Sequence, residues 1–225
     1  IRFCDWSSDV CSSDLIADNG STDRTSEIGR SLDARHKAVR YLSVGKCGFG
    51  LALKTAWDAS SADYVGYMDV DLATDLRHLK EVRDLIDAGA DYELYLGSRL
   101  KQGASVTNRT LLRAFTSRAF NGLLHARLGV SFSDAMCGFK FVDRRFYRRL
   151  TWEFAFSDDW FFATQLAVRA EWLGARIYDM PVLWTDQPDS KSGARLLNLS
   201  KLYLSGISEL RREMRRFKSL KSAAV

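Results

Sequence analysis

Two carboxylates two positions apart are the residues of this sequence best suited to chemistry. Asp69 and Asp71 follow the apolar run 65–68, whose β-branched and aromatic content predicts a buried strand. At this spacing on an extended chain, both side chains leave the same face. Carboxylates this close repel unless a cation lies between them, and a hard divalent ion such as Mg²⁺ or Mn²⁺ favours such a site, often shared with substrate phosphates. An acidic turn before a helix is the alternative, because Asp-x-Asp alone is not specific.

Further polar and glycine residues follow other predicted strands. Asp18 ends an apolar run and precedes an Asn-Gly-Ser turn and a predicted helix at 24–35. It is placed to accept a hydrogen bond from a base or ribose, whereas a simple turn and cap is the alternative. Gly48 and Gly50 open a helix and allow the backbone to approach a ligand closely. They form neither a Walker loop nor a Rossmann fingerprint, because the residues that complete those motifs are missing.

Arginines at two places suggest an anion site. Arg99 ends the predicted strand 93–99, and Arg113 and Ser117 lie four apart in the predicted helix 107–128, hence on one face. A guanidinium beside a hydroxyl suits a phosphate, which arginine binds with two parallel hydrogen bonds. Solvated surface charge is the alternative for the helical pair.

Strands alternate with helices along most of the chain, which favours an α/β fold with a mostly parallel sheet flanked by helices. In open sheets of this kind, ligands bind beyond the carboxyl ends of the strands, where Asp18, Asp69 and Arg99 are predicted to lie. We expect residues 16–194 to form this domain. Residues 1–15 contain a near-duplication, SSDV and SSDL, without a clear helix or strand period, so we interpret them as a non-native or disordered segment.

Residues 195–225 are predicted to form a basic amphipathic helix. From Lys191 onward there are nine Lys and Arg residues against two Glu, although the whole chain has a net charge of +5. Such a tail indicates an anionic partner surface, either a membrane or a nucleic acid, and the helix would suit a membrane interface with anionic lipid. The alternative is that its apolar face docks against the domain. The body carries no basic stripe interleaved with aromatic residues, so we expect no nucleic-acid binding.

The composition is that of a globular protein without a spanning helix. The sequence is 46% hydrophobic and 27% charged, and it has no uninterrupted apolar stretch of 18 residues. The four cysteines are scattered, and no secretory signal is visible. These features predict a cytoplasmic protein.

Six segments in this order resemble the family 2 glycosyltransferases with the GT-A (Rossmann-like) fold. The resemblance is greatest to the branch that glycosylates polyprenyl phosphates, the dolichyl-phosphate glucosyl- and mannosyltransferases. The matching segments cover residues 16 to about 205: Asp18 to Asp23, the Gly48/Gly50 turn, Asp69-Val70-Asp71, Gly97-Ser98-Arg99, Asp134 with Gly138-Phe139-Lys140, and Trp160 within its aromatic run.

This resemblance implies a role for each candidate residue. Asp18, Gly48 and Gly50 would bind the nucleotide sugar, and Asp69 and Asp71 would be the catalytic pair that holds Mg²⁺ or Mn²⁺ with the sugar-nucleotide diphosphate. The acceptor phosphate would be bound by Arg99, Arg113, Ser117 and Lys191. The implied reaction is an inverting transfer of a hexose from a nucleoside-diphosphate sugar to a polyprenyl phosphate, by a protein peripheral to the inner face of the membrane.

The sequence departs from the family at two places that bear on function. The first βα unit is missing, because residues 1–15 stand in its place, and the family's Asp-x-Glu is Ala163-Thr164-Gln165. A hydroxyl acceptor needs a general base, whereas a phosphate monoester is already anionic at neutral pH. The loss of the carboxylates therefore favours a phosphate acceptor. The alternatives are a hydroxyl acceptor with Asp158 or Asp159 as base, and a non-catalytic fragment that only binds nucleotide or membrane.

Overall fold

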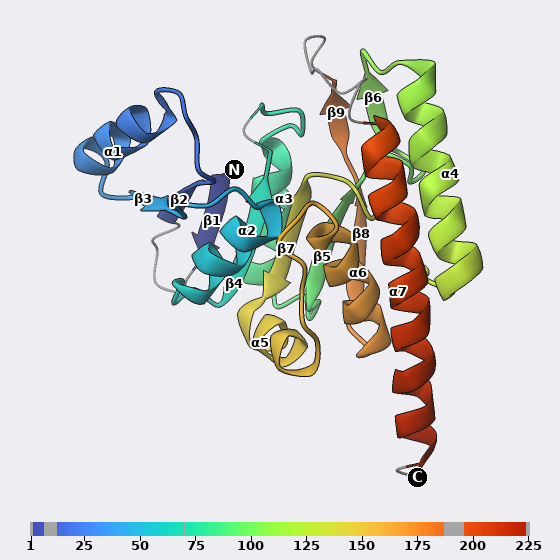
Figure 1. The fold of residues 1–225 in the computed structure, drawn as a ribbon. Coiled ribbons are helices and arrows are strands. Elements are labelled where there is room, and N and C mark those ends of the chain that lie inside the picture. Colours follow the sequence, from blue (N-terminus) through green and yellow to red (C-terminus); the bar gives the residue numbers. More distant parts are fainter. Residues whose placement is uncertain (1, 7–12, 70, 187–195, 224–225) are drawn as a thin grey trace.

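A seven-stranded sheet runs through the middle of the computed structural model, which describes residues 2–6, 13–69, 71–186 and 196–223 (Figure 1). The order of the strands across the sheet is β3-β2-β1-β4-β7-β5-β8. Their bounds are β1 Arg2–Trp6, β2 Ser13–Asp18, β3 Val39–Ser43, β4 Tyr64–Met68, β5 Leu94–Ser98, β7 Phe139–Asp143 and β8 Ile177–Pro181.

The sheet is mixed rather than mostly parallel in its pairing. Strands β2, β3, β4, β5 and β8 run in one direction, and β1 and β7 run against them. Because each reversed strand lies between two forward ones, only the β2–β3 and β5–β8 pairs are parallel. The predicted mostly parallel sheet is thus confirmed for the direction of most strands and wrong for most pairs.

The N-terminal segment contributes a strand to the centre of the sheet. Residues 2–6 form β1, which pairs with β2 on one side and with β4 on the other. Only residues 7–12 separate β1 from β2, and a parallel connection needs a crossover of a dozen or more residues, so the two strands pair antiparallel. The expectation that residues 1–15 form no regular structure therefore does not hold for β1 or for the start of β2.

Helices cover both faces of the sheet (Figure 1). Buried side chains of α2, α4, α5, α6 and α7 share one core with strands β2, β4 and β5, whereas α3 packs in a second core on the other face. A small parallel pair, which the sequence pattern did not predict, joins β6 to β9. The bounds are α1 Thr25–Arg35, α2 Phe49–Asp58, α3 Arg77–Asp87, α4 Leu111–Leu128, α5 Arg144–Glu153, α6 Phe162–Trp172, α7 Leu196–Ala223, β6 Ser105–Thr107 and β9 Leu183–Thr185.

The predicted C-terminal helix is present as α7, and it docks against the domain. It lies alongside α4 (Figure 1). Ile207 and Leu210 are only 3% and 1% exposed in the main core, and Gly206 lies directly against the ring of Phe161. At these residues the apolar face is buried in the domain, so the docking alternative is confirmed here and insertion into a bilayer is not. No helix in the described part of the chain is long and apolar enough to cross a membrane.

Candidate active site

The predicted site residues lie together at the carboxyl ends of several strands. Strands β2, β4 and β5 run in the same direction, so Asp18 at the end of β2, Asp69 after β4 and Arg99 after β5 all lie at this end of the sheet. The reversed strand β7 begins here, which brings the preceding loop, residues 134–138, between the ends of β4 and β5. The predicted convergence of these residues at the carboxyl ends is thus present in the structure.

The Asp69–Asp71 turn is tight and strained. The Leu72 amide donates to the Asp69 carbonyl at 3.3 Å, and the Ala73 amide donates to Asp71 Oδ1 at 3.0 Å. Leu72 has a φ of 55°, in the left-handed region that branched side chains rarely adopt. Strain of this kind persists where the surrounding structure over-determines it and is common at functional sites.

The Asp69 carboxylate is confined and lies within reach of the negative charge of Asp71. Burial, and then the negative charge of Asp71, raise the pKa of Asp69 to about 6, although the positive charges of Lys140 and Arg99 act in the opposite direction. A Cβ on Gly138 would lie 1.8 Å from Asp69 Oδ2, so the glycine leaves the space that this carboxylate occupies. Crowded carboxylates with a raised pKa fit a divalent cation, which would relieve their repulsion.

The protein supplies only part of a coordination sphere. Among the described residues, no group of three or more His, Cys, Asp or Glu side chains is placed to hold a metal ion. Asp69 and Asp71 therefore suit a Mg²⁺-like or Mn²⁺-like ion that completes its coordination with water and substrate phosphates, as such ions commonly do.

Asp18 is buried, and its carboxylate is held from both sides. Its Oδ1 accepts from the Ser21 amide at 2.8 Å, and its Oδ2 accepts from the Tyr41 hydroxyl at 2.6 Å. Burial acts to raise the pKa of Asp18, but the hydrogen bonds from Tyr41 and Ser21 outweigh it, so the pKa is lowered. The side chain is therefore an oriented, ionised acceptor at the end of β2.

The glycine pair approaches protein rather than open space. A Cβ on Gly50 would lie 2.3 Å from the Ser157 carbonyl oxygen, and one on Gly48 would lie 2.9 Å from the Asp158 carbonyl oxygen. The Gly50 amide also donates to the Asp159 carbonyl at 3.2 Å. The glycines thus let the 157–159 loop pack on the start of α2, a contact that the sequence pattern did not predict. Their close approach to a ligand stays a prediction.

Arg99 is bound by a carboxylate that our site prediction did not include. Its Nε and Nη2 donate to the two oxygens of the fully buried Asp134, at 2.7 and 3.0 Å. The guanidinium also lies 4.8 Å from the centre of the Trp184 ring. Asp134 and Trp184 therefore fix the plane in which Arg99 presents its remaining N–H groups.

Arg113 and Ser117 are joined by a third arginine, Arg109. The Arg109 guanidinium donates to the Ser117 hydroxyl and, at 3.3 Å, to the Arg113 carbonyl. Arg113 Nη1 lies 3.7 Å from Asp186 Oδ2. Burial, and then the positive charge of Arg99, lower the pKa of Arg109. Lys191 lies outside the described residues.

These arginines and their carboxylates form a basic cluster at the end of β5. We define it as Arg99, Arg109, Arg113, Asp134 and Asp186, and its three cations outnumber its two anions by one. An anionic ligand would balance the excess charge. The sequence contained Arg109 in the same helix and Asp134 in a matching segment, but nothing in the local pattern indicated their contacts.

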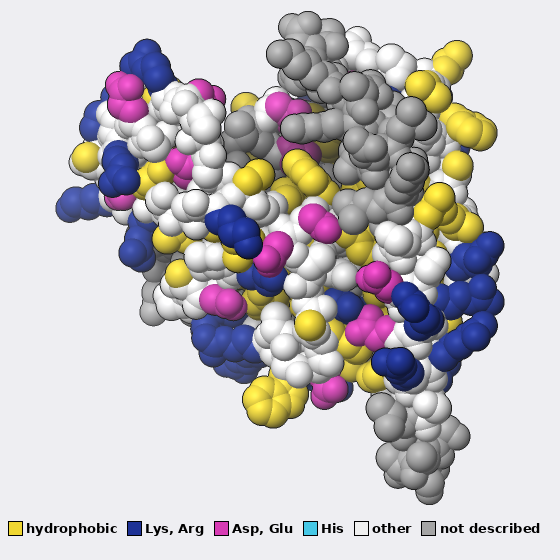
Figure 2. Space-filling view, viewed as in Figure 1, with side chains coloured by type: hydrophobic (Ala, Val, Ile, Leu, Met, Phe, Trp, Pro, Cys, Tyr) yellow, Lys and Arg dark blue, Asp and Glu magenta, His cyan; other side chains and the backbone are white. Residues whose placement is uncertain are grey.

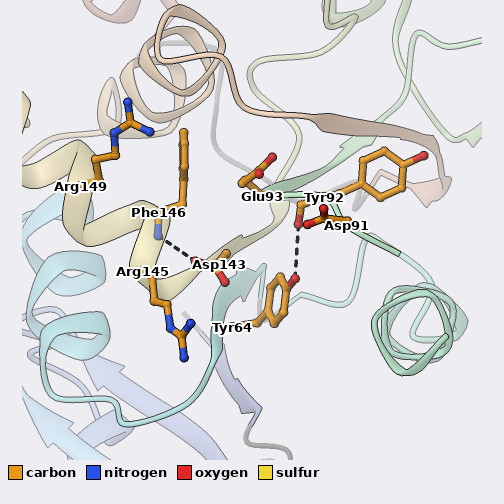
Figure 3. A pocket seen from close by; sticks show the side chains of 8 residues that line it. All are labelled: Tyr64, Asp91, Tyr92, Glu93, Asp143, Arg145, Phe146 and Arg149. Carbon is orange, nitrogen blue, oxygen red and sulfur yellow. Dashed lines mark hydrogen bonds between the residues drawn. The ribbon is translucent and has the colours of Figure 1, made fainter. Parts of the chain in front are cut away.

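A cavity lined in part by Tyr64 and Phe146 is shown in Figure 3. It lies at the other end of the strands from the candidate site. It has a volume of about 310 Å³ and is lined by Tyr64, Asp91, Tyr92, Glu93, Asp143, Arg145, Phe146 and Arg149. Its carboxylates already have partners. Asp143 accepts from the Phe146 amide at 2.7 Å, and Asp91 and Glu93 pair with Arg176. Its position at the start of β4 separates it from the Asp69–Asp71 turn at the other end of that strand.

The crowding of Asp69 predicts a dependence of stability on pH in metal-free protein. Since the pKa of Asp69 is about 6 in the folded chain and ordinarily 3.8, the folded state loses stability as pH rises through this interval. In EDTA at pH 7.5, we expect Asp69→Asn to raise the free energy of unfolding by about 1–3 kcal/mol. This gain should disappear near pH 4, and Mn²⁺ should raise the melting temperature of the wild type but not of the variant. An equal gain in the free energy of unfolding at both pH values would contradict the raised pKa of Asp69.

Comparison with known proteins gives a consistent family. The model of glycosyl transferase family 2 matches residues 15–151. Glycosyltransferase AglD of Haloferax volcanii is 36% identical over 178 residues, which are 79% of this chain and 28% of AglD. Dolichyl-phosphate beta-glucosyltransferase ALG5C of Trichomonas vaginalis is 29% identical over 184 residues, 79% of this chain and 54% of its own length. The chain thus spans about half or less of these two relatives.

The fold also has solved counterparts. Glucosyl-3-phosphoglycerate synthase from Mycobacterium tuberculosis, solved in complex with Mn²⁺ and UDP-glucose, superposes with a TM-score of 0.54 at 20% identity and covers 86% of this chain and 67% of that one. At this identity the likeness shows the fold alone, and it supports the GT-A architecture that the sequence resemblance implied. Because the family model covers more than half of the sequence, including the Asp69–Asp71 turn and Arg99, this chain belongs to glycosyl transferase family 2.

Proposed function

We propose that the protein transfers a hexose from a nucleoside-diphosphate sugar to a polyprenyl phosphate, with inversion at the anomeric carbon. The observation that carries this proposal is the placement of an acid pair and a basic cluster at neighbouring positions of one end of the sheet, with the 134–138 loop between them. The acid pair suits a metal-bound diphosphate, and the basic cluster suits a second phosphate. The names of the relatives support it, since they include dolichyl-phosphate beta-glucosyltransferase and polyprenol monophosphomannose synthase.

The donor half of the site would be built from the ends of β2 and β4. Asp69 and Asp71 would hold Mg²⁺ or Mn²⁺, and Asp18 would accept a hydrogen bond from the nucleoside. Gly48 and Gly50 would contribute through the backbone at the start of α2. The metal, when bound, supplies Lewis-acid stabilisation to the departing nucleoside diphosphate. A structural neighbour solved with Mn²⁺ and UDP-glucose is consistent with this assignment.

The acceptor half would be the basic cluster. Arg99 and Arg113 would donate to the phosphate, and Ser117 would take part through its hydroxyl, which Arg109 orients. A phosphate monoester is ionised at neutral pH and attacks without losing a proton, so it needs cations rather than a base. Lys191 would join this group.

A hydroxyl acceptor is less well supported, because both candidate bases are already engaged. Asp158 pairs with Lys54 at 2.6 Å, and this hydrogen bond lowers the pKa of Asp158, which makes it a weaker base. Asp159 accepts from the Phe161 amide at 2.7 Å and from the Ser157 hydroxyl at 3.0 Å.

An exposed apolar patch beside the basic cluster supports contact with a membrane. We define the α4 patch as Leu111, Leu112 and Phe115, of which Leu111 is 90% and Phe115 is 70% exposed. Figure 2 shows hydrophobic side chains gathered over the start of α4, with Lys and Arg side chains lower along the α4 and α7 side. A polyprenyl chain remains in the bilayer, so a surface of this kind next to Arg113 would bring the acceptor site to the lipid. We therefore propose peripheral binding at the inner face of the membrane through the α4 patch.

The transfer reaction is tested most directly at the acid pair. With UDP- or GDP-hexose, polyprenyl phosphate and Mn²⁺, we expect Asp71→Ala to lower kcat by at least about a hundredfold, because about 3 kcal/mol of transition-state stabilisation is lost. The control is Asp63→Ala, which removes an exposed carboxylate at the other end of β4. Retention of more than about a tenth of the activity in Asp71→Ala would rule out this role.

The acceptor assignment is tested by two arginines of one helix. We expect Arg113→Gln to raise KM for polyprenyl phosphate at least about tenfold and to leave KM for the nucleotide sugar nearly unchanged, because a charge-assisted hydrogen bond is lost. Arg118→Gln is the matched control, since Arg118 is exposed and its guanidinium donates to the Ala114 carbonyl of the same helix at 3.4 Å. Equal increases of both KM values in Arg113→Gln would move Arg113 to the donor diphosphate.

The membrane contact is tested by flotation with anionic vesicles. We expect replacement of the three residues of the α4 patch by Ser to reduce binding at least about fivefold, since buried apolar area is lost. Trp152→Ser serves as the control, because Trp152 is 89% exposed on α5, outside the patch. A variant with Arg211, Arg212, Arg215 and Arg216 changed to Glu measures the electrostatic part. Undiminished flotation of the α4 patch variant would place the membrane contact elsewhere.

A further inference from the structure

A lysine is fully buried in the middle of the sheet, beneath the candidate active site. Lys140 belongs to β7, where it lies opposite Tyr67 of β4 and Leu96 of β5, and it is 0% exposed. Lysines are almost never buried without a partner, since removing an ammonium from water costs several kcal/mol unless other groups compensate. The position therefore calls for an explanation beyond filling the core.

The surroundings of Lys140 supply that compensation. Its ammonium donates to the Cys137 carbonyl and lies 5.6 Å from the centre of the Tyr67 ring. Burial lowers the pKa of Lys140 to about 8, whereas the negative charges of Asp134 and Asp69 favour its charged form. Lys140 in turn lowers the pKa of both carboxylates. One buried cation thus interacts with an acid from each half of the site.

The loop before β7 connects those two halves. At one end, Asp134 binds the Arg99 guanidinium and also accepts from the Arg99 amide at 3.2 Å. Near the other end, the Gly138 carbonyl accepts from the Asp69 amide at 3.0 Å, and the missing Cβ of Gly138 leaves room for the Asp69 carboxylate. The Cys137 carbonyl, which Lys140 binds, lies between these contacts along the loop.

We infer that Lys140 is a positioning residue that holds the 134–138 loop so that Asp69 and Arg99 keep one fixed relation to each other. This inference rests on the proposed function and deepens it. The spacing between the metal-diphosphate site and the acceptor-phosphate site would depend on one buried contact, that of Lys140 with the Cys137 carbonyl. A core-filling role alone would be served by an apolar side chain of similar length. Such a residue would leave the Cys137 carbonyl without its ammonium donor, and Arg99 would be the remaining strong cation near Asp69 and Asp134.

The test measures two affinities in the full chain without turnover. Mn²⁺ binding is followed by calorimetry, and inorganic phosphate binding is followed by competition with a fluorescent phosphate-ester probe. We expect Lys140→Met, which keeps the length and removes the charge, to weaken Mn²⁺ binding at least tenfold and phosphate binding at least threefold. Arg169→Met is the matched control, because Arg169 is another buried cation, paired with Glu213 at 2.8 Å outside both halves of the site. It should lower the melting temperature and leave both affinities within twofold of wild type.

Gly138→Ala tests the same coupling if Lys140→Met does not fold. Its added methyl group acts at Asp69, so a purely local clash weakens Mn²⁺ binding alone. Coupling through the loop predicts that phosphate binding falls as well. Both affinities of Lys140→Met within twofold of wild type, or Gly138→Ala with unchanged phosphate binding, would overturn the inference. Neither measurement needs sugar transfer. The role of Lys140 can therefore be tested even if the proposed transfer reaction does not occur.

Discussion

The confinement of the Asp69 carboxylate next to a second negative charge, that of Asp71, is the constraint on which the candidate site depends. A buried strand brings both carboxylates to its end, and burial together with the second charge raises the pKa of Asp69 to about 6. Several features of the surrounding chain accommodate this pair: the glycine at position 138, the left-handed Leu72 and the buried ammonium of Lys140. A divalent cation would neutralise the two carboxylate charges that the fold holds together, and a diphosphate would complete the coordination of that cation.

The reversed strand β7 explains how the two halves of the site come together. Had every strand run in one direction, the segment before β7 would lie at the amino-terminal ends of β4 and β5. Because β7 is antiparallel to both β4 and β5, its preceding loop lies at the carboxyl ends of its neighbours. Asp134 then binds Arg99, and Gly138 packs on Asp69, within five residues of one loop. A change of strand direction in the middle of the sheet thus serves the geometry of the site.

Two patterns left their partner open for the same physical reason: an apolar or glycine pattern indicates that something approaches closely, but not what approaches. The Gly48 and Gly50 pair suggested a ligand, and the structure brings the 157–159 loop there. The apolar face of α7 suggested lipid, and the structure brings the domain's own core there, with Leu210 1% exposed. Conversely, Leu111 and Phe115 on α4 are apolar and exposed, and it is there that we propose the membrane contact.

The sequence by itself determined most elements and the positions at their ends. Hydrophobic periodicity and glycine turns are local, so they predicted α1, the strand before Asp69 and the long C-terminal helix within a few residues. The ordered motifs also predicted the family, which the comparison confirms. Only the tertiary structure decided that residues 2–6 fill the centre of the sheet, that Asp134 binds Arg99 and that Lys140 is buried beneath both halves of the site. These depend on strand order and on pairs of charges far apart in sequence, and neither strand order nor such long-range pairing is written in any local pattern.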